Sequence, residues 1–207
     1  EIIPEIDLPG HIVAALAAYP ELACFDRLYK VSTRWGEHKD VLCPTEITFD
    51  FIEQVLIEVA QLFPSQYIHI GGDEVPTTRW SQSDIALAVV EEKNLAGVED
   101  LQRYFFERVN EVLVDLNKTP IGWDELVEKG VDSTPVIMAW QGLEKVSEAL
   151  ENGNDVIMTP REYTYFDYSQ SKAGDEPLAQ CCELTLKDVY NMPTKVDYLN
   201  ESDAKIM

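Results

Sequence analysis

The 207-residue sequence predicts an α/β fold in which parallel strands alternate with helices. Short apolar segments rich in β-branched residues alternate with amphipathic segments of helical periodicity. The predicted strands are apolar almost throughout, as expected where helices cover both faces of a parallel sheet. A third observation is that polar or aromatic residues recur at or just beyond strand ends: His11, Asp73, Glu74, Trp123, Trp140 and Tyr165.

This recurrence favours a barrel whose functional site lies at the carboxyl ends of its strands. An open doubly wound sheet is the alternative, but no glycine-rich phosphate-binding turn follows any predicted strand. The sequence contains five predicted strands, fewer than the eight of a closed TIM-type barrel. We therefore interpret residues 1–207 as a fragment of one catalytic domain, an incomplete TIM-type (β/α)8 barrel spanning about strands three to seven.

The first predicted elements are a strand at residues 1–6 and an alanine-rich helix at 12–19, which Pro20 ends. Residues 20–46 are expected to form a long loop, and loops of this length are usually functional or mobile. A helix follows at 48–63, with an expected core-facing stripe of Phe51, Val55, Val59 and Leu62.

The central strand is predicted at 67–70, between Pro64 and the pair Gly71-Gly72. Capping residues at 81–84 predict a helix that reaches about Lys93. The remaining predicted elements are a helix at 99–117, strands at 119–123, 135–140 and 155–158, and a helix at 143–151. Residues 168–207 form an irregular segment, in which Ala204-Lys205-Ile206-Met207 is expected to lead into the last, missing strand.

The net charge of −22 disfavours nucleic acid and anionic membrane surfaces as partners, although it also serves solubility. No apolar run is long enough for a transmembrane helix. The cysteine spacing fits no zinc site. Cys24 and Cys43 could pair in an oxidising compartment, whereas adjacent cysteines such as Cys181 and Cys182 seldom pair.

Asp73 and Glu74 follow the central strand directly, and the preceding glycines allow the chain to bend there. A helix N-cap would explain one of these acids, but not both acids together with two glycines. Ordinary glycosidases place two carboxyl groups on opposite sides of the scissile bond. Because Asp73 and Glu74 are adjacent, they are expected on one side of a site, as one proton donor and one orienting anion. The nucleophile would then come from elsewhere, including from the substrate.

Aromatic residues are expected to gather on the same rim. Trp123 and Trp140 end two predicted strands, and Tyr163 and Tyr165 follow a third. Flat aromatic rings stack on the apolar faces of sugars, while acids bind sugar hydroxyls. A single tryptophan is more often a core residue, but two at matching strand ends favour a carbohydrate site.

With these residues the sequence resembles the glycoside hydrolase family 20 β-N-acetylhexosaminidases. The motifs that carry the resemblance are Pro4-Glu5-Ile6-Asp7-Leu8-Pro9-Gly10-His11, His69-Ile70-Gly71-Gly72-Asp73-Glu74, Gly122-Trp123-Asp124-Glu125, Ala139-Trp140-Gln141-Gly142 and Tyr165-Phe166-Asp167. The resemblance implies removal of terminal β-linked N-acetylglucosamine or N-acetylgalactosamine from glycans, without cofactor or metal. It also implies a retaining mechanism assisted by the substrate's own 2-acetamido group.

The resemblance further implies a role for each site residue. Glu74 is the general acid and base, Asp73 orients the acetamido group, and Tyr165 hydrogen-bonds the acetamido oxygen. Trp123 and Trp140 wall the acetamido pocket, and Asp167 holds sugar hydroxyls. His11 supports Glu74, with Asp7 nearby, although a purely structural loop clamp explains Asp7 and His11 equally well.

The sequence departs from the family pattern at both ends. Nothing matches the family's first two strands, which carry a sugar-gripping arginine and an aspartate partner for the histidine. We therefore expect residues 1–207 alone to be inactive or nearly so, and to self-associate through open sheet edges. The resemblance implies that the parent protein is secreted, periplasmic or lysosomal.

Two other functions remain open at this point. Asp7, His11, His69, Asp73 and Glu74 are ligand types suited to a metal-dependent hydrolase, although their spacing fits no metal-binding motif. The other alternative is a carbohydrate-binding remnant without catalysis. The intact Asp73-Glu74 pair argues against an evolved loss of catalysis.

Overall fold

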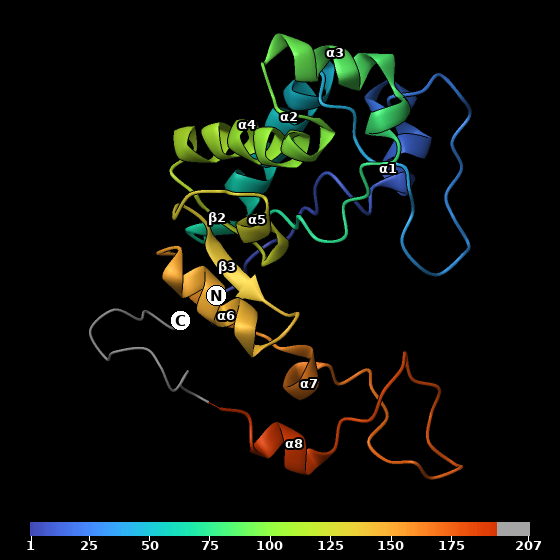
Figure 1. Ribbon diagram of the computed structural model, residues 1–207, viewed down its shortest axis with the longest axis vertical. Coiled ribbons are helices and arrows are strands. Elements are labelled where there is room, and N and C mark those ends of the chain that lie inside the picture. The colour runs from blue at the N-terminus through green and yellow to red at the C-terminus, as the bar shows by residue number, and fades with distance from the viewer. Residues whose placement is uncertain (194–207) are drawn as a thin grey trace.

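A computed structural model describes residues 1–193 and shows one parallel sheet with helices packed around it (Figure 1). Its strands are β1 (Tyr67–His69), β2 (Thr119–Trp123), β3 (Val136–Ala139) and β4 (Val156–Met158), and they are hydrogen-bonded in that order. Neighbouring strands are parallel: His69 pairs with Ile121, Ile121 with Val136, and Ile137 with Val156. The predicted α/β fold with parallel strands is therefore confirmed, and within residues 1–193 the sheet is open.

The predicted strand at residues 1–6 is wrong as a full strand. Only Glu5 forms a bridge, to His69, although the segment runs parallel to β1 with hydrogen bonds from Ile6 N to His69 O (2.8 Å) and Leu8 N to Ile70 O (3.0 Å). Pro4 has no N–H to donate, which limits regular pairing at this position. The segment still brings residues 7–11 to the carboxyl end of β1.

The helices are α1 (Val13–Ala18), α2 (Glu46–Leu62), α3 (Asp84–Glu92), α4 (Leu101–Asp115), α5 (Glu125–Glu128), α6 (Leu143–Glu151), α7 (Arg161–Thr164) and α8 (Leu186–Tyr190). Short 3₁₀ turns lie at Pro20–Leu22, Trp80–Gln82 and Val98–Asp100. The Ser83 hydroxyl caps α3 by accepting a hydrogen bond from the N–H of Ala86. The helix predicted at 143–151 is confirmed, whereas α5, α7 and α8 were not predicted.

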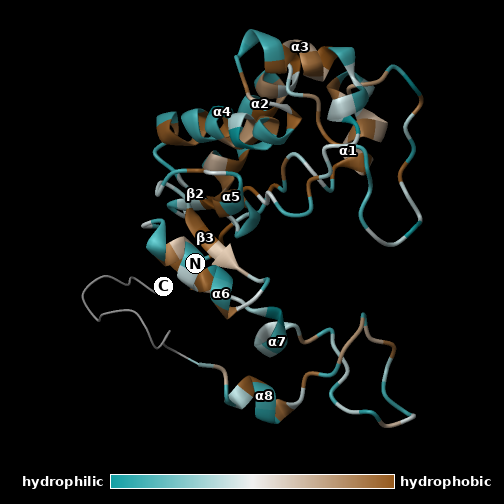
Figure 2. Cartoon of the chain, in the orientation of Figure 1, coloured by the Kyte–Doolittle hydropathy of each residue, from teal (hydrophilic) through white to brown (hydrophobic). Residues whose placement is uncertain are grey.

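The expected core face of α2 is partly wrong. Its buried residues are Thr48, Phe49, Ile52 and Leu56, whereas Leu62 is 74% exposed. Phe51 and Val59 pack only at the edge of the core. The helix is apolar around much of its circumference, so periodicity alone permits two adjacent stripes. Figure 2 shows the pattern in α4 and α6, where apolar and polar residues alternate around the helix, while β3 is mainly apolar.

Two disulfides are present among the described residues, Cys24–Cys43 and Cys181–Cys182. The first is the pairing described as possible in the sequence analysis, and it closes the long loop between the 3₁₀ turn at Pro20–Leu22 and α2. The second runs against the expectation that adjacent cysteines seldom pair. No helix in residues 1–193 is long and apolar enough to cross a membrane. The strand expected to begin at residues 204–207 lies outside the described residues.

Candidate active site

A pocket of about 190 Å³ lies beyond the carboxyl ends of β1, β2 and β3. Its lining residues are Asp73, Glu74, Trp123, Trp140, Tyr165 and Gln180. The structure therefore brings five of the predicted site residues to one place, at the sheet edge that the sequence predicts. Gln180 comes from the irregular C-terminal segment and was missed, because a single glutamine in a polar loop carries no sequence signal.

The backbone after β1 turns sharply to present the two acids. Gly71 and Gly72 have positive φ angles of 69° and 97°, a conformation that glycine accepts without strain. The N–H of Gly72 donates to Asp7 Oδ1 at 3.3 Å, and buried Gln102 donates from Nε2 to the Gly72 carbonyl at 2.7 Å. The turn is thus held by Asp7 from the N-terminal segment and by Gln102 from α4.

We expect Gly71→Ala to destabilise the full-length protein by ~2–4 kcal/mol and to abolish most activity. A Cβ at Gly71 would lie 1.6 Å from Asp7 Oδ1 and 2.8 Å from Asp7 Cα, in addition to the cost of positive φ. Gly36→Ala is the matched control, since Gly36 also has positive φ (109°) but has nothing within 4 Å of its added Cβ. Thermal and urea unfolding measure the difference. Equal destabilisation of the two variants would contradict the close Asp7 contact.

The imidazole of His11 lies close to the carboxylates of both Asp73 and Glu74. Its Nε2 lies 3.3 Å from Asp73 Oδ2 and 3.5 Å from Glu74 Oε2. Both His11 and Glu74 adopt positive φ angles, 51° and 49°, which are uncommon for residues with a side chain. The acids therefore face the same imidazole on one side of the pocket, as the adjacent positions predicted.

The surroundings of Glu74 raise its pKa above the ordinary value for a glutamate. Burial raises the pKa of Glu74, and the charges of Glu37 and Asp73 raise it further. Burial and the charge of Asp73 raise the pKa of Asp7 to about 7. A carboxyl group whose pKa is raised keeps its proton closer to neutral pH, which a general acid requires.

Aromatic side chains form another part of the pocket wall. Trp140 stacks on Tyr165 with ring centroids 6.1 Å apart and an interplanar angle of 9°. Trp123 packs edge-on against His69, with ring centroids 4.8 Å apart. Burial raises the pKa of Tyr165 to about 12, so its hydroxyl remains a hydrogen-bond donor at neutral pH.

Asp167 and Tyr163 are predicted at the site from the sequence, but neither side chain lines this pocket. Asp167 is exposed, and its carbonyl accepts a hydrogen bond from the N–H of Gln180 at 3.1 Å. The Asp167 charge does act on Tyr165, whose pKa it helps to raise. Its assignment to sugar hydroxyls stays a prediction.

The predicted metal ligands come together only in part. Oxygen and nitrogen atoms of Asp7, His11 and Asp73 lie within 4.8 Å of one another, so their donor set could hold a cation. His69 serves another purpose: its Nδ1 accepts the Gly71 N–H at 3.1 Å, and burial lowers its pKa to about 4. His69 therefore belongs to the turn and is neutral.

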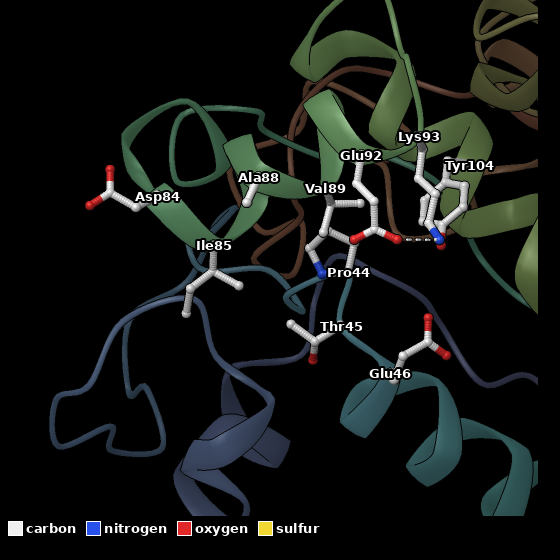
Figure 3. A pocket seen from close by; sticks show the side chains of 10 residues that line it. All are labelled: Pro44, Thr45, Glu46, Asp84, Ile85, Ala88, Val89, Glu92, Lys93 and Tyr104. Atoms are coloured by element: carbon white, nitrogen blue, oxygen red, sulfur yellow. Dashed lines mark hydrogen bonds and ion pairs between the residues drawn. The ribbon is translucent and has the colours of Figure 1, made fainter.

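A larger hollow of about 540 Å³ lies elsewhere, between the start of α2, α3 and α4 (Figure 3). It is lined by Pro44, Thr45, Glu46, Asp84, Ile85, Ala88, Val89, Glu92, Lys93 and Tyr104. Its lysine is already paired, since Lys93 Nζ lies 2.9 Å from Glu92 Oε1. None of the strand-end residues reaches this hollow, so the smaller pocket is the candidate active site.

Comparison with known proteins identifies the family. The model of the glycosyl hydrolase family 20 catalytic domain matches residues 1–207. The chain belongs to glycosyl hydrolase family 20. This confirms the resemblance seen in the motifs, and the TIM-type barrel of this family's structures explains the parallel sheet with its site at the carboxyl ends of the strands.

Several family members are similar over most of this chain. A β-hexosaminidase of Porphyromonas gingivalis is 41% identical over 91% of the chain, and one of Vibrio furnissii is 37% identical over 85%. The matched region covers 25% and 29% of those two proteins. The chain thus spans between a quarter and a third of the length of these relatives.

Solved structures agree with this family assignment. A β-N-acetylhexosaminidase crystal structure superposes with a TM-score of 0.85 at 29% identity, covering 93% of this chain and 42% of that one. The exo-β-N-acetylglucosaminidase of Vibrio harveyi, solved in complex with N-acetylglucosamine, gives a TM-score of 0.81 at 33% identity. The match covers 95% of this chain and 32% of the Vibrio chain.

Proposed function

We propose that the protein containing this chain is an exo-acting β-N-acetylhexosaminidase that removes terminal β-linked N-acetylglucosamine or N-acetylgalactosamine from glycans. One observation carries the proposal: Asp73 and Glu74 face a single His11 nitrogen at 3.3 and 3.5 Å, in a pocket walled by Trp123, Trp140 and Tyr165. Family membership and the names of the similar proteins support the substrate class.

In the proposed reaction, protonated Glu74 donates its proton to the glycosidic oxygen as the bond to the anomeric carbon breaks. The acetamido oxygen of the substrate attacks the same carbon, which forms a cyclic oxazolinium and releases the leaving group as an alcohol. Asp73 stabilises the positive charge on the acetamido nitrogen. Glu74 then takes a proton from water, which opens the ring with retention of configuration.

The same-side placement of the acids favours this route over a protein nucleophile. A retaining glycosidase with a protein nucleophile places two carboxyl groups about 5 Å apart across the scissile bond. Here both acids approach one imidazole from consecutive positions of one turn. Tyr165 lines the same pocket, and in this proposal its hydroxyl donates a hydrogen bond to the acetamido oxygen.

The direct test is hydrolysis of chromogenic N-acetyl-β-glucosaminides and N-acetyl-β-galactosaminides by the full-length protein, with and without a chelator. The expected result is release of the sugar at equal rates in both conditions. Loss of activity with the chelator, restored by a divalent cation, would instead assign Asp7, His11 and Asp73 to a metal centre. Sugar binding without hydrolysis would identify a carbohydrate-binding protein.

A polypeptide limited to residues 1–207 is expected to be inactive and to associate. Within residues 1–193, β4 lies at one end of the sheet order, and Glu5 makes only a single bridge beyond β1 at the other. Exposed strand edges recruit other chains. Size-exclusion chromatography with light scattering, together with the chromogenic assay, tests this. A monomer that turns over about 10 substrate molecules per second would contradict it.

We also infer an oxidising compartment, in agreement with a secreted, periplasmic or lysosomal protein. The Cys24–Cys43 disulfide supports this inference, since disulfides persist in such environments. Mass spectrometry of the protein purified from its native host, with free thiols blocked before digestion, would detect the linked peptides. Recovery of both cysteines as blocked thiols would contradict the inference.

A further inference from the structure

A pair of adjacent acids lies directly behind the aromatic wall and has no part in the reaction just described. Asp124 is buried, with 1% of its surface exposed, and Glu125 is half-buried at the start of α5. Both follow β2 immediately after Trp123. Carboxyl groups are costly to bury unless their contacts compensate, so these contacts indicate their purpose.

Within residues 1–193, the side-chain hydrogen bonds that the pair makes to another element go to the segment after β3. Asp124 Oδ2 accepts the N–H groups of Trp140 and Gln141, both at 3.0 Å. Glu125 Oε2 accepts the indole N–H of Trp140 at 3.1 Å. The two acids therefore hold the Trp140 backbone and its side chain separately. Together these contacts leave the indole in the plane that stacks on Tyr165.

Burial raises the pKa of both acids, and their contacts favour Glu125 over Asp124 as the one that keeps a proton. Two backbone N–H donors stabilise the charged form of Asp124. Burial raises the pKa of Glu125 to about 8, and its hydrogen bond to Asp124 together with the Asp124 charge adds to the rise. The neutral Glu125 can then donate its O–H to Asp124, whose Oδ1 is buried without another partner in the described structure.

We propose that Asp124 and Glu125 are positioning residues that share a proton and lock the Trp140 indole against the acetamido-binding side of the pocket. This inference rests on the proposed function, because Trp140 matters only if a sugar occupies the pocket. Above the pH at which Glu125 ionises, two adjacent carboxylates repel each other. Glu125 then turns toward solvent, and the indole loses its hydrogen-bond acceptor.

Several other charged or titratable groups lie near the pair. Lys145 of α6 favours the charged form of Asp124, and its own pKa lies above the usual lysine range because of Glu128 and Glu148. The guanidinium of Arg161 lies 5.7 Å from the Trp140 ring centroid. Tyr165 and Asp73 line the same pocket as Trp140. Asp7, whose pKa is about 7, also titrates near neutrality, so the test needs a variant that changes Glu125 alone.

The experiment compares Glu125→Gln, Glu125→Ala and the wild type in the full-length protein, over about pH 6 to 10. Glutamine keeps an acceptor for the indole and a donor for Asp124, but it cannot ionise. We expect Glu125→Ala to lower kcat/KM about 10-fold to 100-fold, as loss of a buried hydrogen-bond partner does. Glu125→Gln should recover most of that loss, and its kcat/KM should fall less between about pH 8 and 10 than that of the wild type. Glu128→Ala, on the same helix and paired with Lys145, is the matched control.

Tryptophan fluorescence gives a readout that needs no substrate. The wild-type emission should change around pH 8, and this change should be absent in Glu125→Gln and in Trp140→Phe. Identical fluorescence titrations and identical alkaline limbs in the wild type and Glu125→Gln would overturn the inference. If the wild type hydrolyses no N-acetylhexosaminide yet shows the titration of Trp140, the proposed function fails and the positioning role stands. An unfolded Glu125→Ala leaves the other two variants as the test.

Discussion

Glu74→Gln should lower the turnover of unactivated β-N-acetylglucosaminides by about 100-fold to 10,000-fold. Glutamine keeps the size of the side chain and its position 3.5 Å from His11, but it has no proton of suitable acidity to give to the glycosidic oxygen. The loss should be smaller for substrates with a strongly acidic phenol as leaving group, since such a group departs with little help from an acid.

The measurement is kcat for an alkyl and a nitrophenyl glycoside in the full-length protein, with unfolding curves to verify the fold. Glu53→Gln, an exposed position on α2, is the matched control and should leave both rates unchanged. If Glu74→Gln lowered both substrates equally, Glu74 would have a role other than proton donation. Near-normal turnover of the alkyl glycoside would remove Glu74 from the reaction altogether.

Asp73→Asn should reduce kcat/KM by about 100-fold to 1,000-fold, the effect expected when one electrostatic contact to the transition state is lost. Asparagine keeps the shape of Asp73 but cannot stabilise a positive charge on the cyclised acetamido group. For the same reason a thiazoline analogue of that cyclic species should inhibit the wild type strongly and the variant weakly.

Inhibition constants and rates for the wild type, Asp73→Asn and the exposed α3 variant Asp84→Asn distinguish this from a general charge effect. Asp84→Asn also removes one carboxylate but lies outside the pocket, and it should resemble the wild type. A covalent sugar trapped on any carboxylate of the protein would exclude the substrate-assisted route.

The strand order and the position of the site could be predicted from the sequence because both depend on local patterns. The apolar run before Gly71-Gly72 and the tryptophans at two strand ends sufficed to place β1, β2 and the rim. The burial of α2 could not be predicted in the same way. Phe51 and Phe49 both suit a core-facing position, and only the packing of α4 selects Phe49.

The contacts of the residues that support the site also could not be predicted from sequence patterns. Gln102 lies on an apolar stripe of α4, and nothing local shows that its amide reaches the Gly72 carbonyl. Asp124 and Glu125 appear in a recognised motif, yet their contacts to Trp140 depend on the register of β2 against β3. Long-range contacts of this kind require the fold.

The backbone at His11 and Glu74 has a consequence for how this protein can change in evolution. Asn94 and Asn117 also have positive φ, but asparagine is among the residues that accept this conformation most readily. Histidine also adopts it more often than most residues, but glutamate does not, and a residue held in this conformation at a functional site costs ~1–3 kcal/mol of stability. Under the proposed function, selection for hydrolysis therefore acts against substitutions at these positions that would make the protein more stable. In a lineage that no longer needs the activity, glycine or asparagine at these two positions should be among the first changes to become fixed.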